Sequence, residues 1–215
     1  RSVSRGLGDV YKRQVYIHGG LRSPIGVLNG QYKHMRPEIL GSQVIDEIIN
    51  RYTISHIDGI FCGNAVGTGG NLGRLMGLMC NLPNSVPAIT VDMQCASALM
   101  SIEIAYAHIV SGIMDSAIAG GIESSSLQPE RVYASGDDRE GPYKVAQFTP
   151  QDQSPLAMLK GAERTIHKYN VTKEDLYPHI IGSHQRASAA LDNPYLQSYI
   201  TVSYTHLRAH ETLSD

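Results

Sequence analysis

The sequence lacks the features that mark several large classes of protein. No apolar run reaches the ~18 residues that a membrane-spanning helix needs, and no block of like charges resembles a nucleic-acid-binding arm or an acidic tail. Only three of the 215 residues are cysteines, an odd number that argues against a disulfide framework and fits a reducing cytoplasm. These absences exclude membrane, nucleic-acid-binding and disulfide-rich secreted proteins, and they predict a cytoplasmic location.

What the sequence does contain is typical of a globular protein. Hydrophobic residues make up 42% of the chain and charged residues 18%, and the length suits one domain, or one domain and part of a second. Glycine, with 21 residues, exceeds its usual share of ~7%, which predicts tight turns and close backbone packing.

The two ends do not resemble the rest of the chain. Residues 1–14 and 201–215 show no helical or strand periodicity. A DNA element that encodes Asp9–Gln14 also encodes Val202–His206 when it is read from its opposite strand, and it resembles the transposon-end adapter of sequencing libraries. We therefore expect artefact-like tails at both ends of an interrupted reading frame, with a mildly acidic native part between them.

Apolar strands and amphipathic helices alternate in the first half of the native part. Strands are expected at 15–19, 57–63, 87–93 and 116–121, and helices at 37–50, 72–80 and 95–112. The last of these helices is apolar almost all round, which predicts that it is buried. The alternation predicts an α/β domain over residues 15–123, with a mostly parallel sheet covered by helices on both faces.

The composition changes after Glu123. Residues 124–155 are polar and have little periodicity, which indicates a domain boundary followed by long loops. Helices are expected at 155–169 and 172–190, the second beginning with a capping box of Thr172 and Asp175. We assign residues 124–200 to a second, partial domain.

Cys95 is the strongest candidate for chemistry. It lies where the expected strand at 87–93 passes into the expected helix at 95–112. The start of a helix offers free N–H groups and a partial positive charge, which favour the nucleophilic thiolate form of a cysteine. The small residues Ala96, Ser97 and Ala98 would allow a substrate to come close. The position alone is equally compatible with a buried, inert cysteine.

Other candidate sites are weaker. Cys62 and Cys80 lie in apolar segments, where packing is the simpler interpretation, and no cysteine or histidine spacing predicts a metal site. The segment Gly67–Gly70 suggests a phosphate cradle, but it lacks both the P-loop lysine and the full dinucleotide-binding spacing. A close-packed turn is therefore the favoured interpretation of that segment.

Four motifs in register resemble the N-terminal half of the thiolase family. They are Arg22-Ser23-Pro24-Ile25-Gly26, then Gly63-Asn64 with the glycine-rich loop to Arg74, then Val86–Asp92 leading into Cys95, and then Ala119-Gly120-Gly121-Ile122-Glu123-Ser124-Ser125-Ser126. Weaker matches continue through Met158, Gly161-Ala162-Glu163 and Ser183-His184-Gln185, so the resemblance covers nearly all of residues 15–200.

The resemblance implies a function of acyl-CoA C-acyltransferase, of the acetyl-CoA C-acetyltransferase type. The cysteine that matches Cys95 is acylated by an acyl-CoA, and the acyl group then passes to coenzyme A or to the enolate of acetyl-CoA. The inserted loop domain, which would begin near Ser124, holds coenzyme A as a substrate, and Met158 matches a methionine beside the reacting thioester. The resemblance further implies a homodimer or homotetramer, with no metal and no permanently bound cofactor.

The sequence departs from the family pattern in three places. Cys95-Ala96-Ser97-Ala98 stands where Cys-Gly-Ser-Gly or a close variant is usual, and we expect the two added methyl groups to crowd the acyl pocket and favour short chains. Ala157-Met158-Leu159 lacks the usual histidine before the methionine. The activating histidine, the second cysteine and the asparagine-bearing oxyanion motif of the C-terminal half are absent, so we expect the chain alone to be inactive and poorly soluble.

Two alternatives stay open at this point. Ketoacyl-synthase-like condensing enzymes share the expected fold and carry a cysteine at the same position, although the Gly63-Asn64 and Ala119–Glu123 contexts favour a thiolase. A non-catalytic, thiolase-like protein that binds acyl-CoA is the other alternative. The rate at which iodoacetamide alkylates Cys95, with and without acetyl-CoA, would separate an enzyme from such a binding protein.

Overall fold

The computed structural model describes residues 14–67, 69–139, 141–147, 149–150, 154 and 156–201, so nearly all of the two predicted tails lies outside the described residues. The described residues divide into two compact units. The first unit comprises the described residues up to Pro129 together with residues 199–201, and the second comprises Glu130–Ser198.

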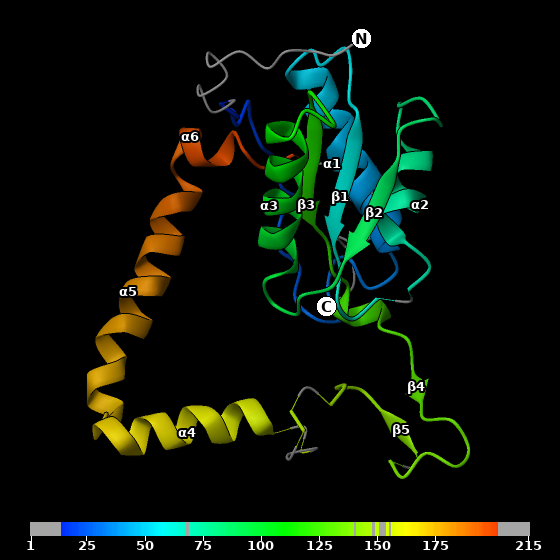
Figure 1. The fold of residues 1–215 in the computed structure, drawn as a ribbon. Coiled ribbons are helices and arrows are strands. Elements are labelled where there is room, and N and C mark those ends of the chain that lie inside the picture. Colours follow the sequence, from blue (N-terminus) through cyan, green and yellow to red (C-terminus); the bar gives the residue numbers. More distant parts are fainter. Residues whose placement is uncertain are drawn as a thin grey trace, which may run out of the picture. The chain divides into compact units, whose positions relative to one another are not determined.

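A three-stranded parallel sheet forms the centre of the first unit (Figure 1). Its strands are β1 (Gly59–Gly63), β2 (Ala88–Val91) and β3 (Ala117–Gly121), in the order β2-β1-β3. Ile60 of β1 stands opposite Ala88 on one side and Ile118 on the other. All five residues of β1 are buried, as expected for a parallel strand covered on both faces. The predicted α/β class and three of the four predicted strands are confirmed.

The strand predicted at 15–19 is wrong. Residues 14–21 form no strand, and Tyr16 and Ile17 are exposed. A strand needs a neighbour to complete its ladder of hydrogen bonds. In this part of the described chain only Arg22 pairs, through an isolated bridge to Ile200.

Helices cover both faces of the sheet, as Figure 1 shows. Helices α1 (Pro37–Arg51) and α2 (Leu72–Met79) lie on one face, and α3 (Ser97–Val110) lies on the other. The side chains of β1 alternate between the two faces. A buried cluster on the α1–α2 face comprises Ile45, Ile57, Ile60, Cys62, Met76, Cys80, Val86 and Ala88. On the opposite face, the ring of Phe61 contacts His108 of α3, with centroids 5.1 Å apart.

The prediction that α3 is buried all round is wrong. Only Ser97, Ser101 and Ala105 of this helix are buried, whereas Leu99 is 68% exposed and Ile102 and Tyr106 are also exposed. The three buried residues recur every four positions and form a narrow stripe of small side chains toward the sheet. Within the described part of the first unit, no element covers the apolar outer face of α3, so this face is exposed although its residues are apolar.

The second unit contains a short hairpin and three helices. Strands β4 (Arg131–Val132) and β5 (Pro142–Tyr143) pair antiparallel, and the rings of Tyr133 and Tyr143 stack at 4.2 Å. Helices α4 (Ala157–Tyr169) and α5 (Lys173–Leu191) confirm the two predicted helices, and α6 (Pro194–Gln197) follows them. The predicted capping box of α5 is present, with the Asp175 N–H donating to Thr172 Oγ1 and the Thr172 N–H donating to the Asp175 carboxylate.

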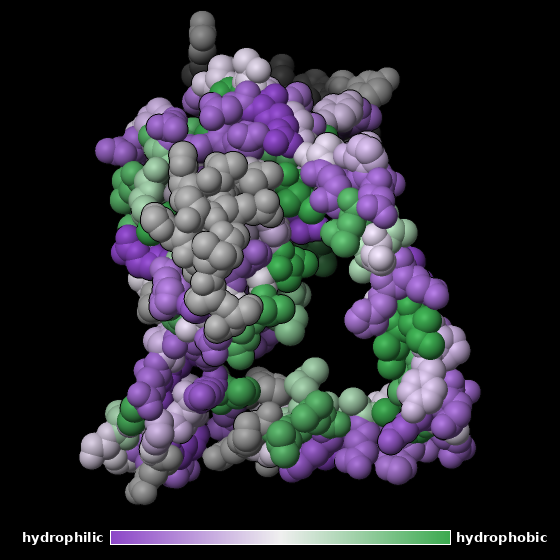
Figure 2. Space-filling model, turned by 180° about the vertical axis from the view of Figure 1, so that it is seen from behind, coloured by the Kyte–Doolittle hydropathy of each residue, from purple (hydrophilic) through white to green (hydrophobic). Residues whose placement is uncertain are grey.

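The helices of the second unit bury none of their residues. Figure 2 shows hydrophobic side chains at the surface of the segment that Figure 1 labels α4 and α5. The exposed hydrophobic residues of α4 and α5 include Met158, Leu159, Ile180 and Ile181. None of the helices among the described residues combines the length and the apolar character needed to cross a membrane.

Candidate active site

The loops that follow the three parallel strands leave the sheet at the same edge (Figure 1). The loop after β1 begins at Asn64, the loop after β2 leads through Asp92 to Cys95, and the loop after β3 begins with Ile122 and Glu123. The carboxyl edge of a parallel sheet is where open α/β proteins bind their ligands. The sequence prediction that Cys95 lies between a strand and a helix is confirmed.

A tight turn presents Cys95 to solvent. Gln94, the residue before it, has a φ of +53°, a left-handed conformation that a non-glycine residue rarely adopts. Ser97 holds this turn: its buried hydroxyl donates to the Gln94 carbonyl at 2.6 Å and accepts from the Met93 N–H at 2.8 Å. The thiol of Cys95 is exposed and lies two residues before the first residue of α3. The turn therefore exposes the Cys95 side chain at the start of a helix, so the alternative of a buried Cys95 is wrong.

Two glycines allow the first turn of α3 to rest directly on the ends of β1 and β3. A Cβ atom added at Gly63 would lie 2.5 Å from the backbone nitrogen of Ala98, and one added at Gly121 would lie 2.9 Å from Ala98 Cβ. Ser101, which has no exposed surface, donates to the Gly120 carbonyl at 2.8 Å. These contacts fix the start of α3 against the carboxyl edge of the sheet.

The same contacts show where the methyl group of Ala98 lies. The sequence suggested that the methyl groups of Ala96 and Ala98 both crowd the nucleophile. The structure places the methyl group of Ala98 over Gly121 at the end of the sheet. The methyl group of Ala98 thus lies close to Gly121 while the residue remains exposed, and the preference for short acyl chains stays a prediction.

The Glu123 carboxylate bridges the loops after β3 and β1. Its Oε1 accepts a hydrogen bond from the Asn64 side-chain amide, and its Oε2 accepts from the backbone N–H groups of Ala65 and Val66, all at 2.9 Å. The sequence analysis listed Glu123 only as part of a motif and gave it no role. A charged residue two positions after a strand that ends in two glycines was the available signal, but it did not reveal the partners on another loop.

The glycine-rich loop supports the interpretation as a turn rather than a phosphate cradle. The backbone N–H groups of Ala65 and Val66 are taken by Glu123. The chain also curls back over Asn64, because a Cβ atom added at Gly67 would lie 2.1 Å from Asn64 Oδ1. Gly69 and Gly70 both adopt positive φ values, which requires the conformational freedom of glycine. Thr68 lies outside the described residues.

The other two cysteines are packing residues, as predicted. Cys62 lies in β1, and Cys80 follows α2 and donates to the Met76 carbonyl at 3.0 Å. Burial raises the pKa of the Cys62 thiol to about 11 and that of the Cys80 thiol to about 12. Both thiols are therefore protonated at neutral pH and shielded from reagents.

A labelling prediction follows from this difference in exposure. Under native conditions we expect iodoacetamide to modify Cys95 alone, and after unfolding in denaturant all three cysteines, as read by peptide mass mapping. The physical reason is that the thiolate is the reacting species and that only Cys95 is exposed. Modification of Cys62 or Cys80 in the native protein, at a rate comparable to that of Cys95, would contradict the buried positions of these two residues.

Met158, the second predicted site residue, lies on α4 in the second unit and is 70% exposed. Cys95 lies in the first unit. The structure thus places both residues at surfaces, each within its own unit. Among the described residues, no group of three or more His, Cys, Asp or Glu side chains is placed to hold a metal ion.

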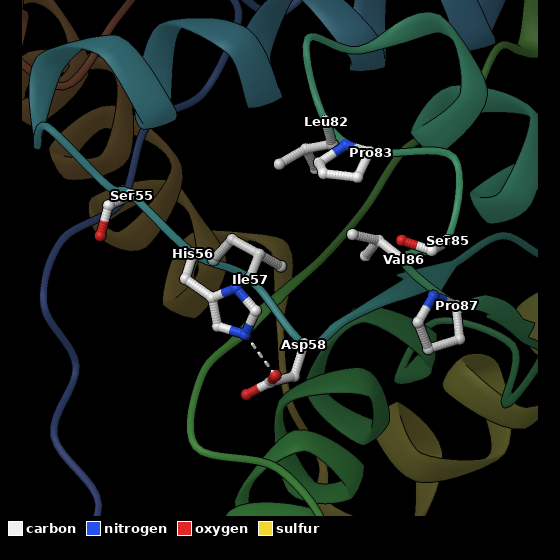
Figure 3. A pocket seen from close by; sticks show the side chains of 9 residues that line it. All are labelled: Ser55, His56, Ile57, Asp58, Leu82, Pro83, Ser85, Val86 and Pro87. Atoms are coloured by element: carbon white, nitrogen blue, oxygen red, sulfur yellow. Dashed lines mark hydrogen bonds and ion pairs between the residues drawn. The ribbon is translucent and has the colours of Figure 1, made fainter.

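Residues that precede the strands, at the opposite edge of the sheet from the loop with Cys95, line a pocket of about 200 Å³. Figure 3 shows the side chains that line it. Its lining includes His56 and Asp58, which precede β1, and Val86 and Pro87, which precede β2. His56 Nε2 lies 2.6 Å from Asp58 Oδ1, and the backbone N–H groups of Asp115 and Ser116 donate to Asp58 Oδ2. Asp58 therefore ties the segment before β1 to the segment before β3.

These bonds make Asp58 a source of pH-dependent stability. The Asp115 N–H, together with His56 and the Ser116 N–H, lowers the Asp58 pKa from 3.8 to about 2. The stabilisation is complete above the unfolded-state pKa and is lost as the pH falls from about 4 to about 2. We expect D58N to be less stable than the parent at neutral pH and to lose less stability on acidification, in urea unfolding across that range. The exposed D192N serves as control; identical pH profiles of D58N and the parent would contradict this role.

Comparison with known proteins agrees with the fold. The sequence model of the family described as "Thiolase, N-terminal domain" matches residues 15–214. A Staphylococcus aureus (strain MSSA476) protein, provisionally named acetyl-CoA C-acetyltransferase VraB, is 33% identical over 186 residues, which cover 84% of this chain and 49% of the relative. The protein of the same name from Staphylococcus epidermidis is 32% identical over 191 residues, with the same coverage.

A solved structure supports the same fold. The crystal structure of the Bacillus anthracis acetyl-CoA acetyltransferase superposes with a TM-score of 0.72 at 24% identity, over 86% of this chain and 49% of that one. The fold is therefore that of the thiolase-like α/β proteins. The chain belongs to the thiolase family, which confirms the resemblance inferred from the four motifs, and its named relatives are acyltransferases. It spans about half the length of the curated relatives that it matches.

Proposed function

We propose that this chain carries the acyl-accepting nucleophile of a thiolase, an acyl-CoA C-acyltransferase of the acetyl-CoA C-acetyltransferase type, and that Cys95 is this nucleophile. The observation that carries the proposal is the exposed thiol on the strained turn between β2 and α3, in a chain of the thiolase family. A thioester carbonyl calls for a soft, strong nucleophile, and a cysteine at a helix start meets this need.

The proposed reaction has two steps at the same sulfur atom. The Cys95 thiolate attacks the carbonyl carbon of an acyl-CoA, an S–C bond forms, and the bond to the coenzyme A sulfur breaks; the leaving thiolate takes up the proton that the cysteine lost. In the synthetic direction the acyl group then passes to the carbon of acetyl-CoA that has lost a methyl proton, and a C–C bond forms as the Cys95 S–C bond breaks. In the degradative direction the thiolate instead attacks the 3-keto carbon of a 3-ketoacyl-CoA, and the C–C bond to the acetyl-CoA unit breaks as the released carbon takes up a proton. The acyl group then passes from Cys95 to the thiol of coenzyme A, whose proton returns to the cysteine.

The backbone around Cys95 would support the first step. The carbonyl oxygen becomes negative as the sulfur adds, and N–H groups fixed before the reaction stabilise such a charge. The N–H of Cys95 is a candidate donor, because two features hold this part of the backbone in place. These are the hydrogen bonds of the Ser97 hydroxyl and the packing of Ala98 against Gly63. We further propose that acyl-CoA is the substrate, that Met158 lies beside the reacting thioester, and that the native protein is a cytoplasmic homo-oligomer without a permanently bound cofactor.

The proposal is tested by protection of Cys95 from alkylation. We expect Cys95 to react with iodoacetamide faster than a cysteine in an unstructured peptide, and acetyl-CoA to slow the reaction by occupying or acylating the thiol. Free pantetheine serves as a weaker competitor, and the C80A variant serves as a matched cysteine control. Slow labelling that acetyl-CoA does not affect would contradict the proposal; slow labelling with protection would identify an acyl-CoA-binding protein instead of an enzyme.

A further inference from the structure

We propose that Glu123 is a positioning residue for the Cys95 site, an inference that rests on the proposed function and deepens it. The carboxylate holds the loop after β1 against the loop after β3, and these two strands end in the glycines on which α3 begins. Glu123 would therefore act on Cys95 through the backbone, without contact with the reacting atoms.

The Glu123 carboxylate is hydrogen-bonded through both of its oxygens. Its two oxygens accept three N–H groups, all from consecutive residues Asn64, Ala65 and Val66. Charge-assisted hydrogen bonds of this kind are about twice as strong as neutral ones. An exposed glutamate that served only solubility would not order three donors of a neighbouring loop, so the arrangement indicates a specific role.

Further hydrogen bonds connect this loop with the ends of the strands. Asn64 is buried, and its side-chain amide also donates to the Ile122 carbonyl at 2.9 Å. Its backbone N–H donates to the Val91 carbonyl, and the Ile122 N–H donates to the Gly63 carbonyl, both at 3.0 Å. Glu123 thus completes a set of bonds that ties the carboxyl ends of all three strands together.

The ends of the strands in turn contact the helix that follows Cys95. A Cβ atom at Gly63 or Gly121 would lie within 3 Å of Ala98, so any shift between the ends of β1 and β3 moves the surface under the first turn of α3. Val91, which Asn64 contacts, lies four residues before Cys95. A displacement of a reacting group by about an ångström is enough to cost a large factor in rate.

The test combines hydrogen exchange with thiol labelling in three variants. We expect E123A to speed exchange in the peptide that spans Cys95–Met100 as well as in the loop after β1, and to slow alkylation of Cys95 about fivefold under folding conditions. E123Q should be milder, because its remaining oxygen can still accept from Ala65 and Val66 while the contact with Asn64 is lost. E103Q, at an exposed glutamate of α3, should match the parent.

The outcomes separate the two proposals. Faster hydrogen exchange at Cys95–Met100 in E123A, with exchange largely back to the parent rate in E123Q, supports the positioning role. Failure of acetyl-CoA to protect Cys95 in the parent chain would contradict only the proposed function and would leave this support intact. Faster exchange confined to the loop after β1, with alkylation unchanged, would overturn the positioning role. A fall in unfolding midpoint alone, without either effect at Cys95, would overturn it equally.

Discussion

Replacing Gly63 with alanine is expected to lower the free energy of unfolding by about 3 kcal/mol, at the upper end of the usual cost of overpacking. The added methyl group would lie 2.5 Å from both the nitrogen of Ala98 and the carbonyl carbon of Ser97. These are backbone atoms, so no side chain can rotate away, and either α3 or β1 must shift. Because α3 begins two residues after Cys95, we also expect slower acylation of the thiol in this variant.

Gly120 provides the matched control for Gly63. It lies in β3, and a Cβ atom added there would meet no atom within 4 Å. We therefore expect G120A to leave the free energy of unfolding within about 0.5 kcal/mol of the parent. Urea unfolding of the two variants measures the difference, and equal stabilities of G63A and G120A would contradict the close approach of α3 to the sheet.

Replacing Ser97 with alanine is expected to cost about 2 kcal/mol, because it leaves a backbone donor without its partner. The buried Ser97 hydroxyl accepts from the Met93 N–H and donates to the Gln94 carbonyl. Without these bonds, the left-handed φ of +53° at Gln94 is less stabilised. We therefore expect S97A to lose acylation of Cys95 to a larger extent than its loss of stability alone would explain.

Ser111 at the other end of α3 is the control for Ser97. Its hydroxyl donates to the His108 carbonyl, but the residue is exposed and lies far along the helix from Cys95. S111A should change the free energy of unfolding by less than about 0.5 kcal/mol and should not change the rate at which Cys95 is alkylated. If S97A and S111A behave alike in thermal unfolding and in labelling, Ser97 does not hold the turn.

The elements of the fold could be predicted from the sequence because local patterns determine them. The apolar spacing of α1 and the proline at its start identified that helix within one residue of its observed end. The pairing of Thr172 with Asp175 located the start of α5. Burial could not be predicted in the same way: α3 is apolar all round, yet only its stripe of small residues packs on the sheet. The segment at 15–19 likewise has the composition of a strand, but composition does not supply a partner strand.

The candidate site, too, could be predicted from the sequence only in part. Cys95 could be predicted because a strand, a small-residue turn and a helix follow one another along the sequence. The bonds of Glu123 to Asn64, Ala65 and Val66 could not, since they join residues nearly sixty positions apart. The direction of the Ala98 methyl group depends on Gly121 of another element, so the expected crowding of the acyl pocket could not be judged from the sequence around Cys95 alone.

The most direct test of the central claim is transfer of an acetyl group from acetyl-CoA to the chain, followed by intact mass and peptide mapping. The account predicts a single added acetyl group on Cys95, removed again by an excess of coenzyme A, and no such adduct in the C95A variant. Both events are single exchanges at one sulfur atom, so they are distinct from the steady-state turnover that we expect the chain alone to lack. The C80A variant should be acetylated like the parent, because Cys80 is buried and its thiol is protonated. Acetylation that persists in C95A, or that maps to another residue, would contradict the assignment of Cys95 as the nucleophile.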